Sequence, residues 1–137
     1  MGDNKDYSVY ISYTEQANEI TTKRQTMNSI YIAIDGALCA LIGTFFGKVG
    51  IVLSIIGIIL SFLWMLMLIE YKKLNSAKFE VIAKMEESLD IKPYTEEWSV
   101  AKKKKYFGIT KIEIITSIII LSVFIILLIF SLVDVIK

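Results

Sequence analysis

Residues Val49–Ile69 read VGIVLSIIGIILSFLWMLMLI, an apolar run of about 21 residues without a charged side chain. At about 1.5 Å per residue, a helix of this length crosses the roughly 30 Å hydrocarbon core of a bilayer. The run continues past Glu70 without Gly or Pro, and apolar residues recur at helical spacing as far as Leu89. We therefore predict one helix that begins after a turn at Gly47 and Lys48, with a membrane half and an amphipathic cytoplasmic half.

The composition of the chain supports a membrane protein. Hydrophobic residues make up 55% of the 137 residues, whereas soluble domains contain about 45–50%. The apolar residues gather in three long segments, which indicates an integral membrane protein. The net charge is only +1, so we expect no nucleic-acid partner.

Residues that carry catalytic or metal chemistry are scarce. The chain contains no histidine, and its one cysteine, Cys39, lies within an apolar segment. No nucleophile motif or phosphate-binding loop is present, and we expect neither enzyme activity nor a metal or cofactor. Two carboxylate pairs, Glu86–Glu87 and Glu96–Glu97, are expected to be solvated, since adjacent residues on a helix point to different faces.

The sequence predicts an all-α integral membrane protein with three transmembrane helices. Its only proline, Pro93, is expected to end the long second helix. The expected parts are an N-terminal cytoplasmic amphipathic helix (1–26), a transmembrane hairpin (27–69, with spans at about 27–46 and 49–69), a cytoplasmic helical extension with a basic connection (70–111) and a third transmembrane helix (112–137).

The distribution of basic residues predicts how the chain is oriented in the membrane. Ten lysines lie between Glu70 and Lys111, whereas the hairpin turn contains only Lys48 and the C-terminal end only Lys137. The positive-inside rule places the lysine-rich connection in the cytoplasm. With three spans, the N-terminus is then inside and the C-terminus outside.

A polar stripe runs along the first span. A carboxylate near the middle of a span costs about 2.5–3.5 kcal/mol on insertion scales, so Asp35 calls for an explanation. Copies of Asp35 could line a cation-selective pore, or the side chain could make a helix contact, for example with Ser54 or Ser61. The stripe consists of residues spaced by four, three and four on one helical face: Arg24, Asn28, Tyr31 and Asp35.

Two further sets of residues are candidates for packing and for membrane contact. Small residues at helical spacing let helices approach closely in lipid, and the apolar face after Glu70 needs a cover from the N-terminal helix or a neighbouring subunit. The candidate oligomer-packing residues are Gly36, Ala40, Ser54, Gly57, Ser61, Leu74, Val81 and Met85. The residues expected to be interfacial or lipid-facing are Trp64, Trp98, Lys102, Lys103, Lys104 and Lys105.

Several local features together resemble the RipA family of small bacterial cytoplasmic-membrane proteins, over roughly residues 7–114. The most specific is LNSAKF, residues 74–79, which follows the span that contains Trp64. The other matching features are Tyr7, Tyr10, Lys23-Arg24-Gln25, Asn28, Tyr71, Val81-Ile82, Glu86, Leu89 and Glu97-Trp98.

The resemblance implies a homo-oligomer, an octamer, in the bacterial inner membrane, with a cytoplasmic portion built from the segments that flank the hairpin. It implies no catalytic residue. This chain departs from the family pattern at Asp35, where an uncharged polar residue such as Asn is expected. The chain also resembles the two-span SLATT proteins of bacterial conflict systems, which are proposed pore-forming effectors, although its third span fits them less well.

Three functions are compatible with this pattern. The first is an oligomeric scaffold that contacts membrane lipids and presents a cytoplasmic helical ring to a partner protein. The alternative is an oligomeric pore or ion channel with Asp35 in the conduction path. The third is an accessory subunit of a transporter or envelope complex.

Overall fold

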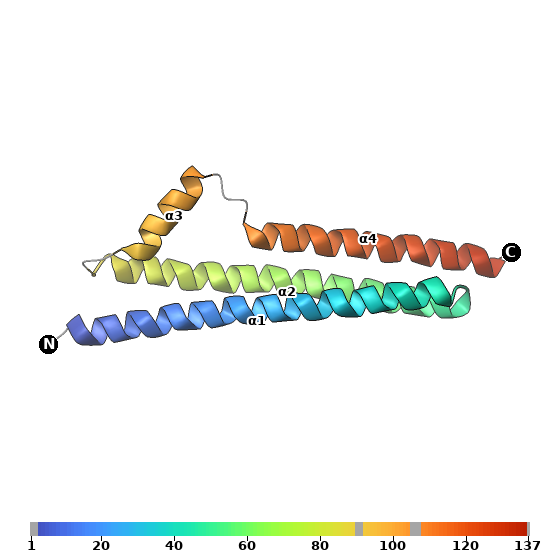
Figure 1. Cartoon of the computed structure of the whole chain (residues 1–137), viewed down its shortest axis with the longest axis horizontal. Helices are drawn as coiled ribbons and strands as arrows, with labels where there is room; N and C mark the ends of the chain where they lie inside the picture. Colours follow the sequence, from blue (N-terminus) through green and yellow to red (C-terminus); the bar gives the residue numbers. More distant parts are fainter. Residues whose placement is uncertain (1–2, 90–91, 105–107, 137) are drawn as a thin grey trace. The chain divides into compact units, whose positions relative to one another are not determined.

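The computed structural model describes residues 3–89, 92–104 and 108–136, and every regular element in these ranges is an α-helix (Figure 1). Three of the helices are long and apolar enough to cross a membrane, which confirms the predicted all-helical architecture with three candidate spans. The four helices are α1 (Asp3–Thr44), α2 (Lys48–Glu86), α3 (Pro93–Lys103) and α4 (Ile109–Ile136).

The chain divides into two compact units. Unit 1 comprises Met1–Arg24 and Glu70–Gly108, and unit 2 comprises Gln25–Ile69 and Ile109–Lys137. Both long helices of the hairpin, α1 and α2, contribute a segment to each unit. Unit 2 contains the apolar runs of all three candidate spans, whereas unit 1 contains most of the charged residues.

Helix α1 is continuous over 42 residues. The described residues of the expected N-terminal amphipathic helix (1–26) and most of the first expected span (27–46) lie in this one helix, which has no break between them. The reason is local, because residues 3–44 include no proline and no glycine before Gly36. At about 1.5 Å per residue the helix is roughly 63 Å long, about twice the hydrocarbon thickness, so about half of it extends beyond a bilayer core.

The turn between α1 and α2 occupies residues 45–47 rather than the expected 47–48, and Lys48 is already the first residue of α2. Gly47 has a φ of 79°, a left-handed conformation that glycine adopts without a steric penalty from Cβ. Because the connection is so short, α1 and α2 are antiparallel neighbours (Figure 1).

Helix α2 ends at Glu86, and Pro93 does not terminate it as expected. The amides of residues 87, 88 and 89 instead bond to carbonyl oxygens three residues earlier, at 3.3, 3.1 and 3.2 Å, which tightens the last turn. Pro93 is the first residue of α3. Proline favours this position because its fixed φ is helical and its missing N–H would have no partner in the first turn.

In unit 2, two glycines of α2 let α4 approach closely. A Cβ added at Gly57 would lie 2.3 Å from Cε1 of Phe124, and a Cβ added at Gly50 would lie 2.5 Å from Oγ of Ser131. Since Gly57 meets the earlier residue of α4 and Gly50 the later one, α2 and α4 are antiparallel. Phe124 is fully buried in this contact. The two glycines thus allow side chains of α4 to pack directly against the backbone of α2 within one chain.

In unit 1, the N-terminal half of α1 covers the amphipathic half of α2. The buried core consists of Tyr10 and Ala17 from α1 and Ile82 from α2. Partly buried residues pack around it: Tyr13, Phe79, Met85, Leu89 and Tyr94. The apolar face that needed a cover is therefore covered from about residue 79 to residue 89 by the chain's own N-terminal segment.

Candidate functional site

The carboxylate of Glu86 joins the three helices of unit 1. Its side chain is 1% exposed, which corrects the expectation of a solvated carboxylate pair. Oε1 accepts hydrogen bonds from the hydroxyl of Tyr10 at 2.8 Å and the backbone N–H of Tyr94 at 2.7 Å. Oε2 accepts from the backbone N–H of Thr95 at 2.9 Å and from its Oγ1 at 2.7 Å. These four bonds compensate the cost of burying the carboxylate.

Glu86 acts as the cap of α3. The N-cap residue of α3, Lys92, makes no side-chain cap hydrogen bond. The amides of Tyr94 and Thr95 belong to the first turn, which has no partners within its own helix. Glu86 accepts from both amides, and its negative charge also interacts favourably with the positive end of the α3 dipole. The start of α3 is therefore stabilised by a side chain from α2.

Electrostatics keep this cluster in one protonation state near neutral pH. Burial raises the pKa of Glu86, but the hydrogen bonds from Thr95, Tyr94 and Tyr10 outweigh burial and hold it below its ordinary value of 4.5. Burial, the hydrogen bond to Glu86 and the charge of Glu86 raise the pKa of Tyr10 to about 12. Glu86 is thus an ionised acceptor and Tyr10 a protonated donor, which is the pairing that the geometry requires.

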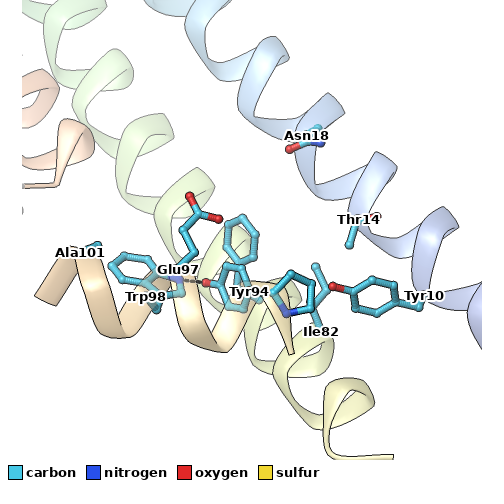
Figure 2. A pocket seen from close by; sticks show the side chains of 10 residues that line it. Tyr10, Thr14, Asn18, Ile82, Tyr94, Glu97, Trp98 and Ala101 are labelled. Carbon is cyan, nitrogen blue, oxygen red and sulfur yellow. Dashed lines mark hydrogen bonds between the residues drawn. The ribbon is translucent and has the colours of Figure 1, made fainter. Parts of the chain in front are cut away.

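Beside this cluster, residues of α1, α2 and α3 line an open cleft of about 550 Å³ (Figure 2), which we call the aromatic cleft. Tyr10 and Ile82 are its buried residues, whereas Asn18, Glu97 and Trp98 are exposed lining residues. Its full lining is Tyr10, Thr14, Asn18, Phe79, Ile82, Pro93, Tyr94, Glu97, Trp98 and Ala101.

Aromatic contacts shape the α3 side of the cleft. The rings of Phe79 and Tyr94 are stacked, with centroids 4.6 Å apart and an interplanar angle of 2°. Trp98 meets Tyr94 edge-on at 6.2 Å and donates its Nε1–H to the Tyr94 hydroxyl. Figure 2 shows Tyr94 and Trp98 on α3, across from Thr14 and Asn18 on α1. The sequence identified Trp98 as an interfacial residue, and the structure places it in the lining of this cleft.

In unit 2, Asp35 is enclosed within the chain. It is 1% exposed, and its Oδ2 accepts a hydrogen bond from Oγ of Ser61 at 3.3 Å. Ser61 was one of two expected partners, and the other, Ser54, has a buried Oγ without a hydrogen bond among the described residues. Within the same unit, the Tyr31 ring stacks on Trp64 at 5.9 Å with an angle of 4°. Two residues of the predicted polar stripe, Tyr31 and Asp35, thus contact α2.

The other stripe residues also lie on the inner side of α1. Arg24, in unit 1, is buried with 7% of its surface exposed, and Asn28, in unit 2, is half-buried.

Trp64 is not lipid-facing within the chain, contrary to the expectation. It is fully buried because it lies one helical turn after Ser61 on the α2 face that meets α1, where Tyr31 covers it. Trp98 is 39% exposed. The lysines that end α3 and follow it, Lys102, Lys103 and Lys104, are exposed, and Lys105 lies outside the described residues.

The candidate packing residues fall into two groups. Gly36, Ala40 and Leu74 are exposed on the outside of the chain, and a Cβ added at Gly36 would have no atom within 4 Å. The others lie within the chain: Ser54, Gly57 and Ser61 are buried in unit 2, and Val81 and Met85 are half-buried in unit 1.

The sequence analysis missed the Tyr10–Glu86 pair, although a signal for it exists. Glu86 follows Ile82 by four residues, so it lies on the apolar face of α2. A charged residue on an otherwise apolar helical face indicates a buried partner. Within the part of the chain that the structure describes, no group of three or more His, Cys, Asp or Glu residues could hold a metal ion.

The comparison with known families agrees with this architecture. The model of the octameric membrane protein family (8xMP) matches residues 8–133, which include parts of both units and the apolar runs of all three candidate spans. No curated protein and no solved structure matches the chain. Since the family model covers most of the sequence, this helical membrane protein belongs to the octameric membrane protein family.

Proposed function

We propose that the chain is the subunit of an octameric membrane scaffold, in which unit 1 of each subunit contributes to a cytoplasmic ring that a partner protein binds. The observation that carries the proposal is the Glu86 cluster. Four hydrogen bonds to one buried carboxylate fix segments of α1, α2 and α3 as one ordered surface outside the apolar unit. A protein that only anchors in the membrane does not require an ordered polar unit of this kind, whereas a protein that binds a partner does.

The family and the lysine distribution support the remaining parts of the proposal. The family is named for octamers, so eight copies are the proposed assembly. Ten lysines between Glu70 and Lys111 favour a cytoplasmic unit 1, with the N-terminus inside and the C-terminus outside the bacterial inner membrane. The likeness to the RipA family is consistent with this assignment. The likeness to SLATT effectors supports the alternative, a pore.

The outer faces of the chain are the proposed contacts between subunits. Gly36 and Ala40 are exposed on the membrane half of α1, and Leu74 is 49% exposed on α2. Small residues separated by four positions allow a second helix to approach closely in lipid. In unit 1, the exposed leucine Leu74 would also be covered in the assembled ring.

The position of Asp35 favours a scaffold over a pore. A residue that selects ions has to face the water-filled path. Asp35 is instead 1% exposed in the single chain and bonded to Ser61 of α2. A cation path lined by Asp35 would require α1 and α2 to separate at this contact.

Ion flux from liposomes tests the proposal. The purified oligomer would be reconstituted as wild type, as Asp35→Asn and as Asp134→Asn, a control change at an exposed carboxylate near the end of α4. A scaffold gives no flux above empty liposomes from any of the three, while cross-linking shows the same oligomer in each. Cation flux that loses selectivity only in Asp35→Asn would contradict the scaffold and establish a pore.

A further inference from the structure

We propose that the aromatic cleft of unit 1 binds a small organic ammonium cation. This inference does not depend on the scaffold, because the cleft is formed within one chain. It follows from the aromatic walls of the cleft, from the sign of its charge and from its size.

Aromatic rings supply the attraction for a cation. Tyr10, Phe79, Tyr94 and Trp98 all line the cleft. The face of an aromatic ring carries a negative electrostatic potential, and a cation over it is attracted, most strongly over Trp. The rings of Phe79 and Tyr94 are stacked on each other, Trp98 meets Tyr94 edge-on, and all three side chains also line the cleft. The cleft therefore offers indole and phenol surfaces of the kind that bind alkylammonium groups.

The charge of the residues that line the cleft favours a ligand of the opposite charge. Among the described residues that line the cleft, Glu97 is the only one with a charged side chain, and none is Lys or Arg. An anionic ligand would find no opposite charge in the lining. The charge of Glu97 also acts inside the cleft, since burial together with the charges of Glu97 and Glu86 raises the pKa of Tyr94 to about 12. Both charges that act on Tyr94 are negative, which favours a cation over an anion at this wall of the cleft.

Unit 1 already contains one contact of this kind. The ammonium group of Lys78 lies 5.1 Å from the centroid of the Tyr13 ring, and it also donates to Oε1 of Gln16 at 2.9 Å. A cation over an aromatic ring with a polar acceptor beside it is the arrangement that the aromatic cleft would provide with Trp98 and Glu97. The volume of about 550 Å³ lies within the range of small-molecule sites, about 300–1,000 Å³.

Binding of choline to the purified full-length protein in a non-ionic detergent tests the proposal. Its uncharged carbon isostere, dimethylbutanol, has the same shape without the charge and serves as the matched ligand. Calorimetry should show choline binding at least about tenfold more tightly, the ratio that corresponds to a typical cation–π contribution. Equal affinity for the two ligands, or no choline binding, would overturn the proposal.

Three variants locate the binding site. Glu97→Gln removes the charge, and Trp98→Leu removes the indole, and each should weaken choline binding by about five- to thirtyfold. Glu96→Gln removes an exposed neighbouring charge that does not line the cleft, and it should leave affinity unchanged. Helix content measured by circular dichroism controls for folding. If Glu97→Gln and Trp98→Leu bind choline as the wild type does, the aromatic cleft is not the site.

Nanodiscs distinguish a soluble amine from a lipid headgroup as the source of the cation. If headgroups occupy the cleft, choline should bind more weakly in phosphatidylcholine discs than in phosphatidylglycerol discs. Equal choline affinity in both discs supports a soluble ligand. Neither result depends on flux or oligomer number, so a failure of this inference is distinguishable from a failure of the scaffold.

Discussion

The hydroxyl of Tyr10 donates a 2.8 Å hydrogen bond to the buried carboxylate of Glu86, which lies 76 positions later in the chain. The same carboxylate accepts the first-turn amides of α3 through Tyr94 and Thr95. One side chain therefore connects three helices whose other contacts are mostly apolar. The stability of unit 1 should depend on this carboxylate more than on its exposed ion pairs, such as Lys23–Glu19, which typically contribute little.

Replacing Tyr10 by Phe tests the long-range bond. The change keeps the ring but removes a hydrogen bond to a charged acceptor, and it should destabilise unit 1 by about 1.5–3 kcal/mol. Hydrogen exchange of the amides of α1 and α3 in detergent would show the loss as faster exchange. Tyr13→Phe is the control, because it preserves the ring under Lys78 and leaves Glu86 unchanged. Equal effects of the two changes would argue against a special role of the Tyr10 hydroxyl.

Replacing Glu86 by Gln tests the cap of α3. The amide retains one acceptor oxygen, but its NH₂ group would face donors, so the amides of Tyr94 and Thr95 should exchange faster. Losing a cap typically costs about 1 kcal/mol of stability. The weaker hydrogen bond from the buried Tyr10 hydroxyl to an uncharged acceptor adds to this loss of stability. Glu87→Gln changes the exposed neighbour and should have no effect on α3. Unchanged protection of Thr95 in Glu86→Gln would contradict the capping role.

Unit 1 should lose stability at both extremes of pH. The pKa of folded Glu86 lies below the unfolded value of 4.5, so its contribution is present above pH 4.5 and is lost as the pH falls through the folded pKa. The pKa of Tyr10 rises from 10.0 to about 12, so its contribution is present below pH 10 and is lost as the pH rises towards 12. Helix content by circular dichroism and tyrosinate absorbance would follow both transitions. Tyr10→Phe should remove one late-titrating tyrosine, and an unchanged absorbance titration would disprove the assignment.

Adding a methyl group at Gly57 tests the packing of α4 on α2. The new Cβ would lie 2.3 Å from the ring of Phe124, and overpacking of this kind costs about 1–3 kcal/mol. Gly57→Ala should therefore lower the thermal stability of the chain in detergent, and Phe124→Leu in the same molecule should restore part of it. Gly36→Ala is the control, because the position is open within the chain. If Gly36→Ala instead dissociates the oligomer, Gly36 lies at a subunit contact.

The two tryptophans should respond oppositely to quenchers. Trp64 is fully buried against Tyr31, whereas Trp98 is 39% exposed at the aromatic cleft. In a Trp98→Phe variant, the remaining Trp64 should emit at short wavelength and resist both acrylamide and brominated lipids. In Trp64→Phe, acrylamide should quench Trp98 readily. Strong quenching of Trp64 by brominated lipids would place it at the lipid surface after all.

Much of the fold could be predicted because long apolar runs and helical periodicity are local signals. The run Val49–Ile69 and the absence of Gly or Pro after it predict one long helix as far as Leu89, and the structure has this helix, α2, ending three residues earlier at Glu86. A buried charge in an apolar span also needs a partner, which made Ser61 a predictable neighbour of Asp35. These inferences need only one helix, or two helices joined by a short turn.

The candidate site could not be predicted in the same way because it depends on side-chain contacts among three helices, one of which contributes a residue 76 positions away. Pro93 is compatible both with the end of one helix and with the start of the next, and the difference depends on whether Glu86 caps α3. Trp64 presents a similar ambiguity, because within an apolar span the lipid and a neighbouring helix are equally apolar surroundings. In both cases the decision depends on contacts that sequence spacing does not specify.

The two kinds of bond at Glu86 have a consequence for the order in which the chain assembles. The bonds to Tyr94 and Thr95 close loops of only eight and nine residues, whereas the bond to Tyr10 closes one of 76. Short loops close faster and lose less chain entropy than long ones. The contact between the end of α2 and the start of α3 should therefore form before the contact with Tyr10. The hydrogen bond from Tyr10 can form only later, when α1 has packed against α2. The fourth hydrogen bond to Glu86 is therefore a sign that these two helices have paired.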